Sequence, residues 1–253
     1  AASERAMSGT RDENLFMARL AEQAERYEDM IEYMKRVATM GTDLNVDERN
    51  LLSVAYKNYV SARRNSWRQM TLLEQREGGD RAAWIADYRR TVESELEAKC
   101  NDIISILDTH LIPQAQQSSS MAEPQAFFMK MKGDYFRYSA EFQRDAQAKA
   151  TAADSANGAY ASALQHAEAS LGAANPVRLG LALNYSVFFN EVMKDPAQAM
   201  ELARKTCESG NAGLPALSEE EQRDSSQILQ LLTDNLQLWQ SGAKPGEAQL
   251  DGT

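Results

Sequence analysis

The chain has 253 residues, with 37 acidic and 27 basic side chains, and its formal net charge is −10. Affinity for nucleic acids or anionic membranes comes mainly from a surplus of Lys and Arg, so this balance disfavours both kinds of partner. Hydrophobic residues make up 43% of the chain, enough to bury a core in one large domain or two small ones. An acidic protein can nevertheless hold one positive pocket, so binding of a single anionic group stays open.

The sequence lacks the usual signatures of enzymes, metal sites and membrane proteins. Cys100 and Cys207 cannot form a disulfide framework, which favours a reducing, intracellular location. There is no apolar run of about 18 residues, and the N-terminal segment lacks the apolar stretch of a signal peptide. His110 and His166 are too few for a typical histidine-based site, and no nucleotide-binding, hydrolase or metalloprotease motif occurs. We therefore expect no catalytic activity, metal or cofactor.

Helical periodicity dominates the chain. No stretch alternates with β-branched residues and no Asn-Gly hairpin signal occurs, so strands are not expected. Gly41 and the pair Gly78 and Gly79 are typical helix ends. Pro124 suits a first helical turn, and Ser218, followed by three glutamates, suits an N-cap. The nine predicted helices cover residues 13–24, 27–40, 47–77, 81–111, 124–146, 147–169, 176–193, 196–208 and 218–239.

Four segments are predicted to lie outside these helices. Residues 112–113 should end the fourth helix, because proline has no N–H to continue the helical hydrogen bonds. Residues 114–123 are polar, serine-rich and expected to be mobile. Residues 210–213 contain two glycines and are predicted as a loop, and the polar tail from residue 241 is predicted to be disordered. The short links imply mostly antiparallel neighbouring helices.

Two basic clusters contain aromatic residues as well. Lys57 and Arg64 lie seven residues apart in one predicted helix, so they share a face. A second cluster covers residues 130–138. In one interpretation these cations are solvated or paired with carboxylates such as Asp134 and Glu141, since surface ion pairs are common and mostly weak.

In the other interpretation Lys57, Arg64 and Arg137 converge. Cations held together repel one another until an anion binds between them. A phosphomonoester fits such a site, because it carries about −1.5 to −2 charges and three acceptor oxygens. Two arginines could hold it bidentately, with lysine as a point charge and the Tyr138 hydroxyl as a further donor. Periodicity alone does not decide between the two interpretations.

The later helices carry apolar stripes that contain asparagines. The simplest interpretation of the apolar residues is a core seam. The amides of Asn184 and Asn235 are more informative, because an unpaired amide in an apolar surrounding is costly. Each amide could hold the backbone of an extended peptide or bond to the protein's own backbone. The other residues that recur at helical spacing on these stripes are Leu183, Val187, Glu191, Leu231, Leu238 and Trp239.

Six segments of the chain closely resemble the 14-3-3 protein family. They occur in the family's order and span nearly the whole chain. They are LAEQAERYEDM (20–30), ERNLLSVAYKNYVSARRNSWR (48–68), LIP (111–113), KMKGDYFRY (130–138), NPVRLGLALNYSVFFNE (175–191) and QLLTDNLQLW (230–239).

The resemblance implies an all-α fold of nine antiparallel helices that form a cup-shaped protomer, assembled as a dimer. It also implies a non-catalytic adaptor that binds extended segments of client proteins carrying phosphoserine or phosphothreonine. The implied phosphate ligands are Lys57, Arg64, Arg137 and Tyr138. The implied peptide groove is lined by Lys130, Gly180, Leu183, Asn184, Val187, Glu191, Leu231, Asn235, Leu238 and Trp239.

For the dimer, the resemblance implies contacts of the N-terminal helix with the third and fourth helices of a partner. Thr91 stands where the family commonly has lysine, so Asp29 would lose its usual partner. Phosphorylation of Ser66 would place negative charge at a packed interface. An ion pair between Arg26 and Glu95 is expected across the interface. The implied interface residues are Leu20, Ala24, Arg26, Asp29, Ser66, Tyr88 and Glu95.

Taken together, the sequence predicts one helical domain over residues 1–240 and a flexible tail over 241–253. The expected partners are phosphorylated client proteins and a second copy of the chain or a related chain, with no nucleic acid and no membrane insertion. The expected location is the cytoplasm, with the nucleus as a further possibility. The alternative is a helical-repeat scaffold of the tetratricopeptide type that binds unmodified peptides, although no 34-residue self-similarity supports it.

Overall fold

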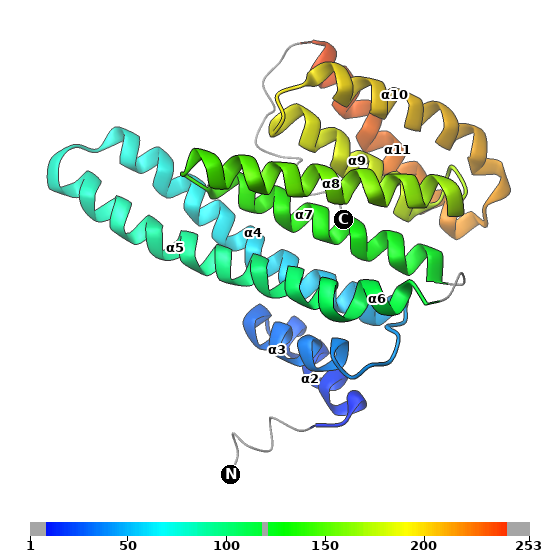
Figure 1. Cartoon of the computed structure of the whole chain (residues 1–253), viewed down its shortest axis with the longest axis horizontal. Helices are drawn as coiled ribbons and strands as arrows, with labels where there is room; N and C mark the ends of the chain where they lie inside the picture. Colours follow the sequence, from blue (N-terminus) through cyan, green and yellow to red (C-terminus); the bar gives the residue numbers. More distant parts are fainter. Residues whose placement is uncertain (1–8, 118–120, 242–253) are drawn as a thin grey trace. The chain divides into compact units, whose positions relative to one another are not determined.

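The computed structural model describes residues 9–117 and 121–241 (Figure 1), and every regular element within these ranges is helical. The predicted all-α class is therefore confirmed. The described part contains nine long helices, as predicted, and three short helical segments. The long helices are α2 (Arg11–Gln23), α3 (Tyr27–Ala38), α4 (Val46–Arg76), α5 (Gly79–Ile106), α7 (Ala122–Phe142), α8 (Ala146–Ser170), α9 (Pro176–Glu191), α10 (Pro196–Gly213) and α11 (Glu219–Gln240).

The chain divides into two compact units, which are described separately below. The first contains the chain up to Gln114 together with Phe142–Arg144, and the second contains Ala115–Glu141 and the chain from Asp145 onward. The predicted single domain over residues 1–240 stays a prediction. Residues 242–253 of the predicted tail lie outside the described residues.

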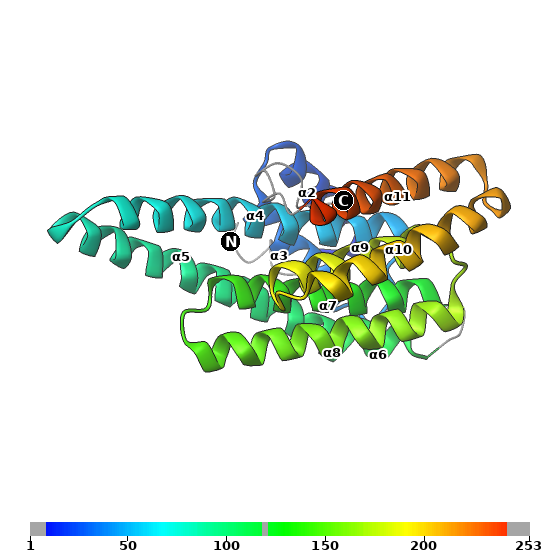
Figure 2. The same ribbon diagram turned by 90° about the horizontal axis from the view of Figure 1, so that it is seen from above.

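In the first unit, α4 packs against α3 and α5, and α2 packs against α3 and α4. Figures 1 and 2 show α4 and α5 running side by side as a long pair. Two capping boxes start this unit's helices, because Thr10 and Asn45 each accept from a backbone N–H while Glu13 and Glu48 return a bond to the cap. Gly79 begins α5 with a φ of +59°, a conformation that favours glycine.

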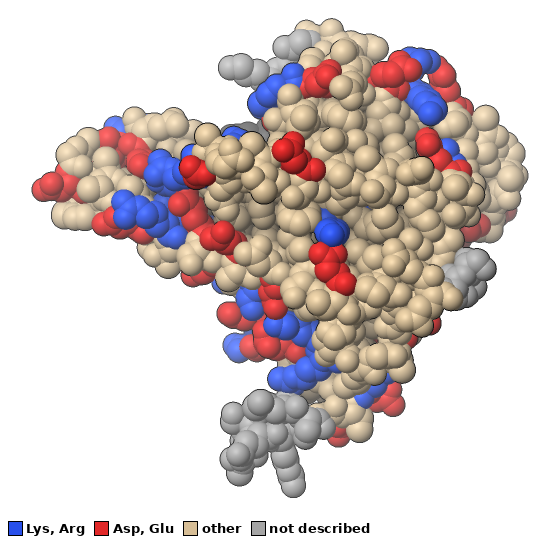
Figure 3. Space-filling view, viewed as in Figure 1, with Lys and Arg blue, Asp and Glu red and all other residues tan. Residues whose placement is uncertain are grey.

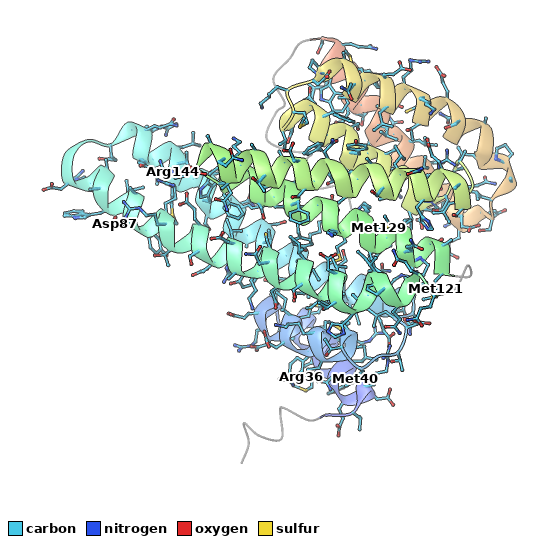
Figure 4. The ribbon with its side chains drawn as sticks, in the orientation of Figure 1. Arg36, Met40, Asp87, Met121, Met129 and Arg144 are labelled. Atoms are coloured by element: carbon cyan, nitrogen blue, oxygen red, sulfur yellow. The ribbon has the colours of Figure 1, made fainter. Side chains whose placement is uncertain are left out.

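An ion network ties α4 to α5. The side chain of Arg89 is 2% exposed, and its Nε lies 2.8 Å from Glu74 Oε2. The same guanidinium also pairs with Glu93, which accepts a 2.9 Å hydrogen bond from Trp67 Nε1. Arg144, labelled in Figure 4, adds a more distant contact of 3.9 Å to Glu74. A buried arginine with two carboxylate partners is tolerated because its charge is compensated.

The second unit contains two apolar clusters. One surrounds the fully buried Tyr160 of α8, which stacks on Tyr185 and contacts Phe188 of α9; Met129 of α7, labelled in Figure 4, packs against it. The other joins α9, α10 and α11 through Leu179, Ala203, Leu229 and Leu232, which are all buried. The alanine-rich α8 carries few charged residues, and Figure 3 shows sparse charge over this face.

Three predicted helix boundaries were wrong. The fourth helix does not stop at residues 112–113, because it continues through the π-helical segment η1 (Leu107–Leu111) into α6 (Ile112–Ala115). The N–H of Ile112 bonds to the carbonyl of Leu107, five residues back. A proline at 113 would otherwise meet the carbonyl four residues earlier, and a π turn locally changes that register.

The other two corrections concern α7 and α10. The α7 helix ends at Phe142, because Asp145 caps α8 by accepting from the N–H of Ala148 at 2.8 Å. The predicted loop at residues 210–213 is the last turn of α10, followed by η3 (Leu214–Ala216). Gly210 serves close packing there, since a Cβ would lie 2.8 Å from a methyl carbon of Leu229. The predicted cap Ser218 is confirmed, with a full capping box to Glu221.

No helix in the described part is long and apolar enough to cross a membrane.

Candidate functional site

In the first unit, Lys57 and Arg64 lie two turns apart on α4. The separation is about 10.5 Å along the axis at nearly the same angle, so the two side chains share a face. Arg64 is 4% exposed and Lys57 is half-buried. Among the described residues of this unit, no carboxylate forms an ion pair with Lys57. Lys57 therefore adds a positive charge to this face of α4, beside the buried Arg64.

The nearby acid Asp102 is occupied elsewhere. Its Oδ2 accepts from the Tyr56 hydroxyl at 2.7 Å, and its Oδ1 pairs with Lys35 Nζ at 2.7 Å. Burial and this carboxylate together raise the pKa of Tyr56 well above its ordinary value, so the phenol stays neutral. Asp102 thus stabilises the packing of α3, α4 and α5.

In the second unit, Arg137 and Tyr138 of α7 are 5% and 7% exposed. The guanidinium carbon of Arg137 lies 4.6 Å from the centroid of the Tyr138 ring, a cation–π distance. Arg137 Nε donates to the Tyr160 hydroxyl at 3.2 Å. Burial opposes the charge of Arg137, but Tyr160, Tyr138 and Asp134 raise its pKa well above the ordinary value, so it remains a cation.

Asp134 joins residues from three helices in this unit. It is 7% exposed, and it accepts hydrogen bonds from the Tyr160 hydroxyl of α8 and from Asn184 Nδ2 of α9, the latter at 2.8 Å. Lys130 Nζ lies 3.1 Å from its other oxygen, and Arg137 lies 3.8 Å away. Burial alone would raise the pKa of Asp134, but Lys130, Arg137 and the two hydrogen bonds hold it below its usual value. Asp134 is therefore a carboxylate.

This cluster retains a positive surplus. Lys130 and Arg137 are two cations, and Asp134 is the one carboxylate that they share. A buried charge without compensation is costly, so an anion bound here would be stabilised. The prediction that Asp134 pairs with the cations is confirmed, but the pairing neutralises only half of their charge. The cluster therefore keeps one net positive charge, and its guanidinium can bind an oxyanion.

The apolar residues of the predicted groove lie on α9, which also supplies Asn184 to this cluster, and on α11. Leu183 belongs to the buried α9–α10–α11 core, and Leu231 and Trp239 are half-buried against it. Val187 is buried, and Leu238 and Glu191 are half-buried. The core interpretation is thus correct for Leu183, whereas Leu231, Leu238 and Trp239 keep exposed surface that a ligand could cover.

The two asparagines differ in their surroundings. The Nδ2 group of Asn184 is occupied by Asp134, which leaves its carbonyl oxygen and one N–H. Asn235 is half-buried, and its amide bonds to none of the described residues of its unit. Gly180 lies next to Lys130, whose Cε would be 3.7 Å from an added Cβ.

Comparison with known proteins identifies the family. The family model described as 14-3-3 protein matches residues 17–240. The chain belongs to the 14-3-3 family. The chain is 50% identical over 241 residues to the 14-3-3-like protein GF14 nu of Arabidopsis thaliana, covering 93% of this chain and 89% of that protein. It is 49% identical over 242 residues to the checkpoint signal transducer rad25 of Schizosaccharomyces pombe, covering 94% and 88%.

Members of the 14-3-3 family are regulatory adaptors and not enzymes; they bind client proteins and form dimers. A regulatory adaptor role follows for this chain. Within the described ranges, no group of three or more His, Cys, Asp or Glu side chains could hold a metal ion.

The predicted 14-3-3 phosphate ligands fall on both units. Arg137, Tyr138 and Lys130 lie together on α7, and Asn184 of α9 bonds to Asp134 between them. Lys57 and Arg64 lie together on α4 of the other unit. Convergence of the two pairs stays a prediction.

The predicted 14-3-3 dimer residues belong to the first unit. Leu20 and Tyr88 are 48% and 65% exposed, and Ala24 and Ser66 are also exposed. Arg26 pairs with Asp29 in its own chain. Glu95 pairs with Arg63 at 2.9 Å. Both members of the expected Arg26–Glu95 interface pair therefore already have partners.

Several residues of these surfaces were not predicted from the sequence. Phe16 and Trp84, each 67% exposed, lie one turn before Leu20 and Tyr88, and this four-residue spacing could have revealed them. Tyr160 gave no such signal, because it lies in an alanine-rich helix far along the chain from its partners. The bonds from Asp134 to α8 and α9 were not predicted, because its neighbours in the sequence are cations and suggest only local ion pairs.

Proposed function

We propose that this 14-3-3 protein binds client segments carrying phosphoserine or phosphothreonine, held in an extended form. In this proposal Lys57 and Arg64 of the first unit and Arg137 and Tyr138 of the second bind one phosphate group. The observation that carries the proposal is the buried cluster of Lys130, Asp134 and Arg137, in which two cations share one carboxylate.

A phosphate monoester fits the proposed site better than other anions do. It carries about −1.5 to −2 charges near neutral pH and offers three acceptor oxygens. The Nε of Arg137 donates to Tyr160 and one terminal amino group lies 3.8 Å from Asp134, so the terminal N–H groups make no short hydrogen bond to Asp134 and can donate to an oxyanion. With Lys57 and Arg64 counted as well, the proposed site has four cations and one carboxylate, and a peptide carboxylate would compensate only one of the three remaining charges.

The groove residues support an extended peptide. Asn184 and Asn235 offer amide groups for a main chain whose own hydrogen bonds are unmet in extended form. Leu231, Leu238 and Trp239 provide half-buried apolar surface for alternate side chains. In an extended chain successive side chains point to opposite sides, so one side could contact this surface.

Fluorescence anisotropy with a labelled phosphoserine peptide and its unphosphorylated twin tests the proposal. The phosphorylated peptide should bind at least about a hundredfold more tightly, because two or more charge-assisted bonds of about 1.5–3 kcal/mol each depend on the phosphate. Equal affinity would reject it and would favour a scaffold for unmodified peptides. Lys57→Glu should weaken binding of the phosphorylated peptide. Lys149→Glu, on the exposed face of α8, makes the same change in charge outside the proposed site and is the control.

We also propose a symmetric dimer with a second copy of this chain. The exposed apolar residues Phe16 and Leu20 on α2 and Trp84 and Tyr88 on α5 form two stripes that such a contact would cover. Asp87, labelled in Figure 4, lies on the exposed side of α5 near the second stripe and pairs with Arg90. Because Arg26 and Glu95 have partners in their own chain, the contact should depend more on apolar burial than on ion pairs.

A cytoplasmic location, with the nucleus as a further possibility, is also part of the proposal. Cys100 and Cys207 are both free thiols. Free thiols are typical of reducing compartments.

A further inference from the structure

A hydrogen-bond network around Asp134 connects two groups of the proposed ligand site. One oxygen of Asp134 accepts from both the Tyr160 hydroxyl and Asn184 Nδ2. The same hydroxyl accepts from Arg137 Nε at 3.2 Å. The four side chains come from α7, α8 and α9, so the network fixes three helices relative to one another. Arg137 and Asn184, which would contact a phosphate and a peptide main chain, are thereby linked through one carboxylate.

In this hydrogen-bond network each group has a fixed role as donor or as acceptor. A carboxylate only accepts, so Asn184 must present its NH₂ group to Asp134, and its carbonyl oxygen is directed elsewhere. The Tyr160 hydroxyl has one hydrogen, which goes to Asp134, so its oxygen must accept from Arg137. If Asp134 could donate, the Asn184 amide could turn over and the order of the Tyr160 bonds could reverse. The orientation of both ligand groups therefore follows from a single acceptor.

The aromatic ring of Tyr160 is also held in place. It stacks on Tyr185 with centroids 5.3 Å apart, and it lies against Gly133 so closely that an added Cβ would be 2.7 Å from two ring carbons. A glycine directly before Asp134 thus lets Tyr160 approach the α7 backbone. The hydroxyl reaches Asp134 and Arg137 because of this close approach.

We propose that Asp134 and Tyr160 are positioning residues for ligand binding, which hold Arg137 and Asn184 in the orientation that a phosphorylated peptide requires. The proposal rests on the proposed function. Neither residue needs to touch the ligand. Preorganised groups bind more tightly because less side-chain freedom is lost on binding.

Charge and positioning predict opposite effects at Asp134. If Asp134 only neutralises its neighbours, Asp134→Asn removes a negative charge near a dianion and should tighten binding. If Asp134 positions Asn184 and Arg137, the variant should weaken binding, because an amide can donate as well as accept and the fixed orientation is lost. Tyr160→Phe changes no charge and keeps the ring on Gly133, so it isolates positioning.

The experiment measures affinity for the phosphoserine peptide and its unphosphorylated twin by anisotropy, and melting temperature by calorimetry. The variants are Tyr160→Phe, Asp134→Asn, Asn184→Ala and the double variant of the last two. The control is Tyr185→Phe, which removes a hydroxyl from the same aromatic cluster, but one bonded to Asn157 at 2.8 Å and not to Asp134.

We expect Tyr160→Phe and Asp134→Asn each to weaken phosphopeptide binding about tenfold, with Tyr185→Phe unchanged. The effects of Asp134→Asn and Asn184→Ala should be less than additive, because they remove the same orientation. A purely structural role would instead lower the melting temperature and give additive effects. Wild-type affinity in Tyr160→Phe, or tighter binding by Asp134→Asn, would overturn the inference while the proposed function stands. If the wild type does not prefer the phosphorylated peptide, the proposed function fails first.

Discussion

Substitution of Gly133 by alanine should damage the second unit, although alanine is the better helix former. Gly133 lies inside α7, where Gly→Ala usually stabilises by about 1 kcal/mol. Here the added Cβ would be 2.7 Å from the Tyr160 ring, well inside the 3.4 Å at which ordinary contacts begin. The ring is fully buried and stacked, so it cannot move away freely. Displacement of the ring should also weaken the hydroxyl's bonds to Asp134 and Arg137.

The expected net loss is about 1.5–5 kcal/mol. Overpacking costs about 1–3 kcal/mol and a weakened hydrogen bond to charged groups about 1.5–3 kcal/mol, and the helix propensity offsets about 1. Urea denaturation monitored by circular dichroism measures the loss. Gly158→Ala in α8 is the matched control, since nothing lies within 4 Å of its added Cβ, and it should be neutral or stabilising. If Gly133→Ala is as stable as Gly158→Ala, the close approach of Tyr160 is refuted.

Three further predictions concern the fold and the dimer. Ser218→Ala removes the capping box of α11 and should lower the free energy of unfolding by about 1 kcal/mol, whereas the exposed mid-helix Ser226→Ala should change it little. Arg89→Met should lower the free energy of unfolding by about 1.5–3 kcal/mol, measured by thermal unfolding, because the half-buried Glu74 and Glu93 lose a charge-assisted partner. Hydrogen bonding to Arg89 lowers the pKa of Glu74, so the wild type loses this stabilisation as the pH falls from about 4.5 through the lowered pKa. The free energy of unfolding of Arg89→Met should therefore fall less steeply over the same acid range. An identical pH dependence in the two proteins would contradict this. Trp84→Glu should shift the sedimentation mass to that of one chain at low micromolar concentration, and an unchanged mass would remove Trp84 from the contact.

The fold followed largely from local signals. Helical periodicity, the cap at Ser218 and the glycines at 41 and 79 act within one or two turns, so the sequence alone reveals them. The failures have non-local causes. Gly210 looks like a loop residue until Leu229 of α11 is packed against it, and the stop at residues 112–113 is removed by a π turn that no short pattern announces.

The sequence suggested candidate ligands but not the hydrogen bonds that connect them. Spacing and resemblance identified Arg137 and Asn184, since each lies in a recognisable segment. The bond from Tyr160 to Asp134 spans 26 residues, and that from Asn184 spans 50. Such pairings depend on how three helices pack, and a single sequence carries no direct record of it. The net charge of −10 likewise gives no sign that the buried Arg137 and the half-buried Lys130 share one acid.

The central proposal is that Lys57, Arg64, Arg137 and Tyr138 bind the phosphate group of a client segment. Anisotropy titration of the phosphoserine peptide and its unphosphorylated twin against wild type, Lys57→Glu and Arg137→Leu tests it most directly. The account predicts a strong preference for the phosphorylated peptide in the wild type and a loss of most of that preference in each variant. A preference that survives either substitution would contradict it.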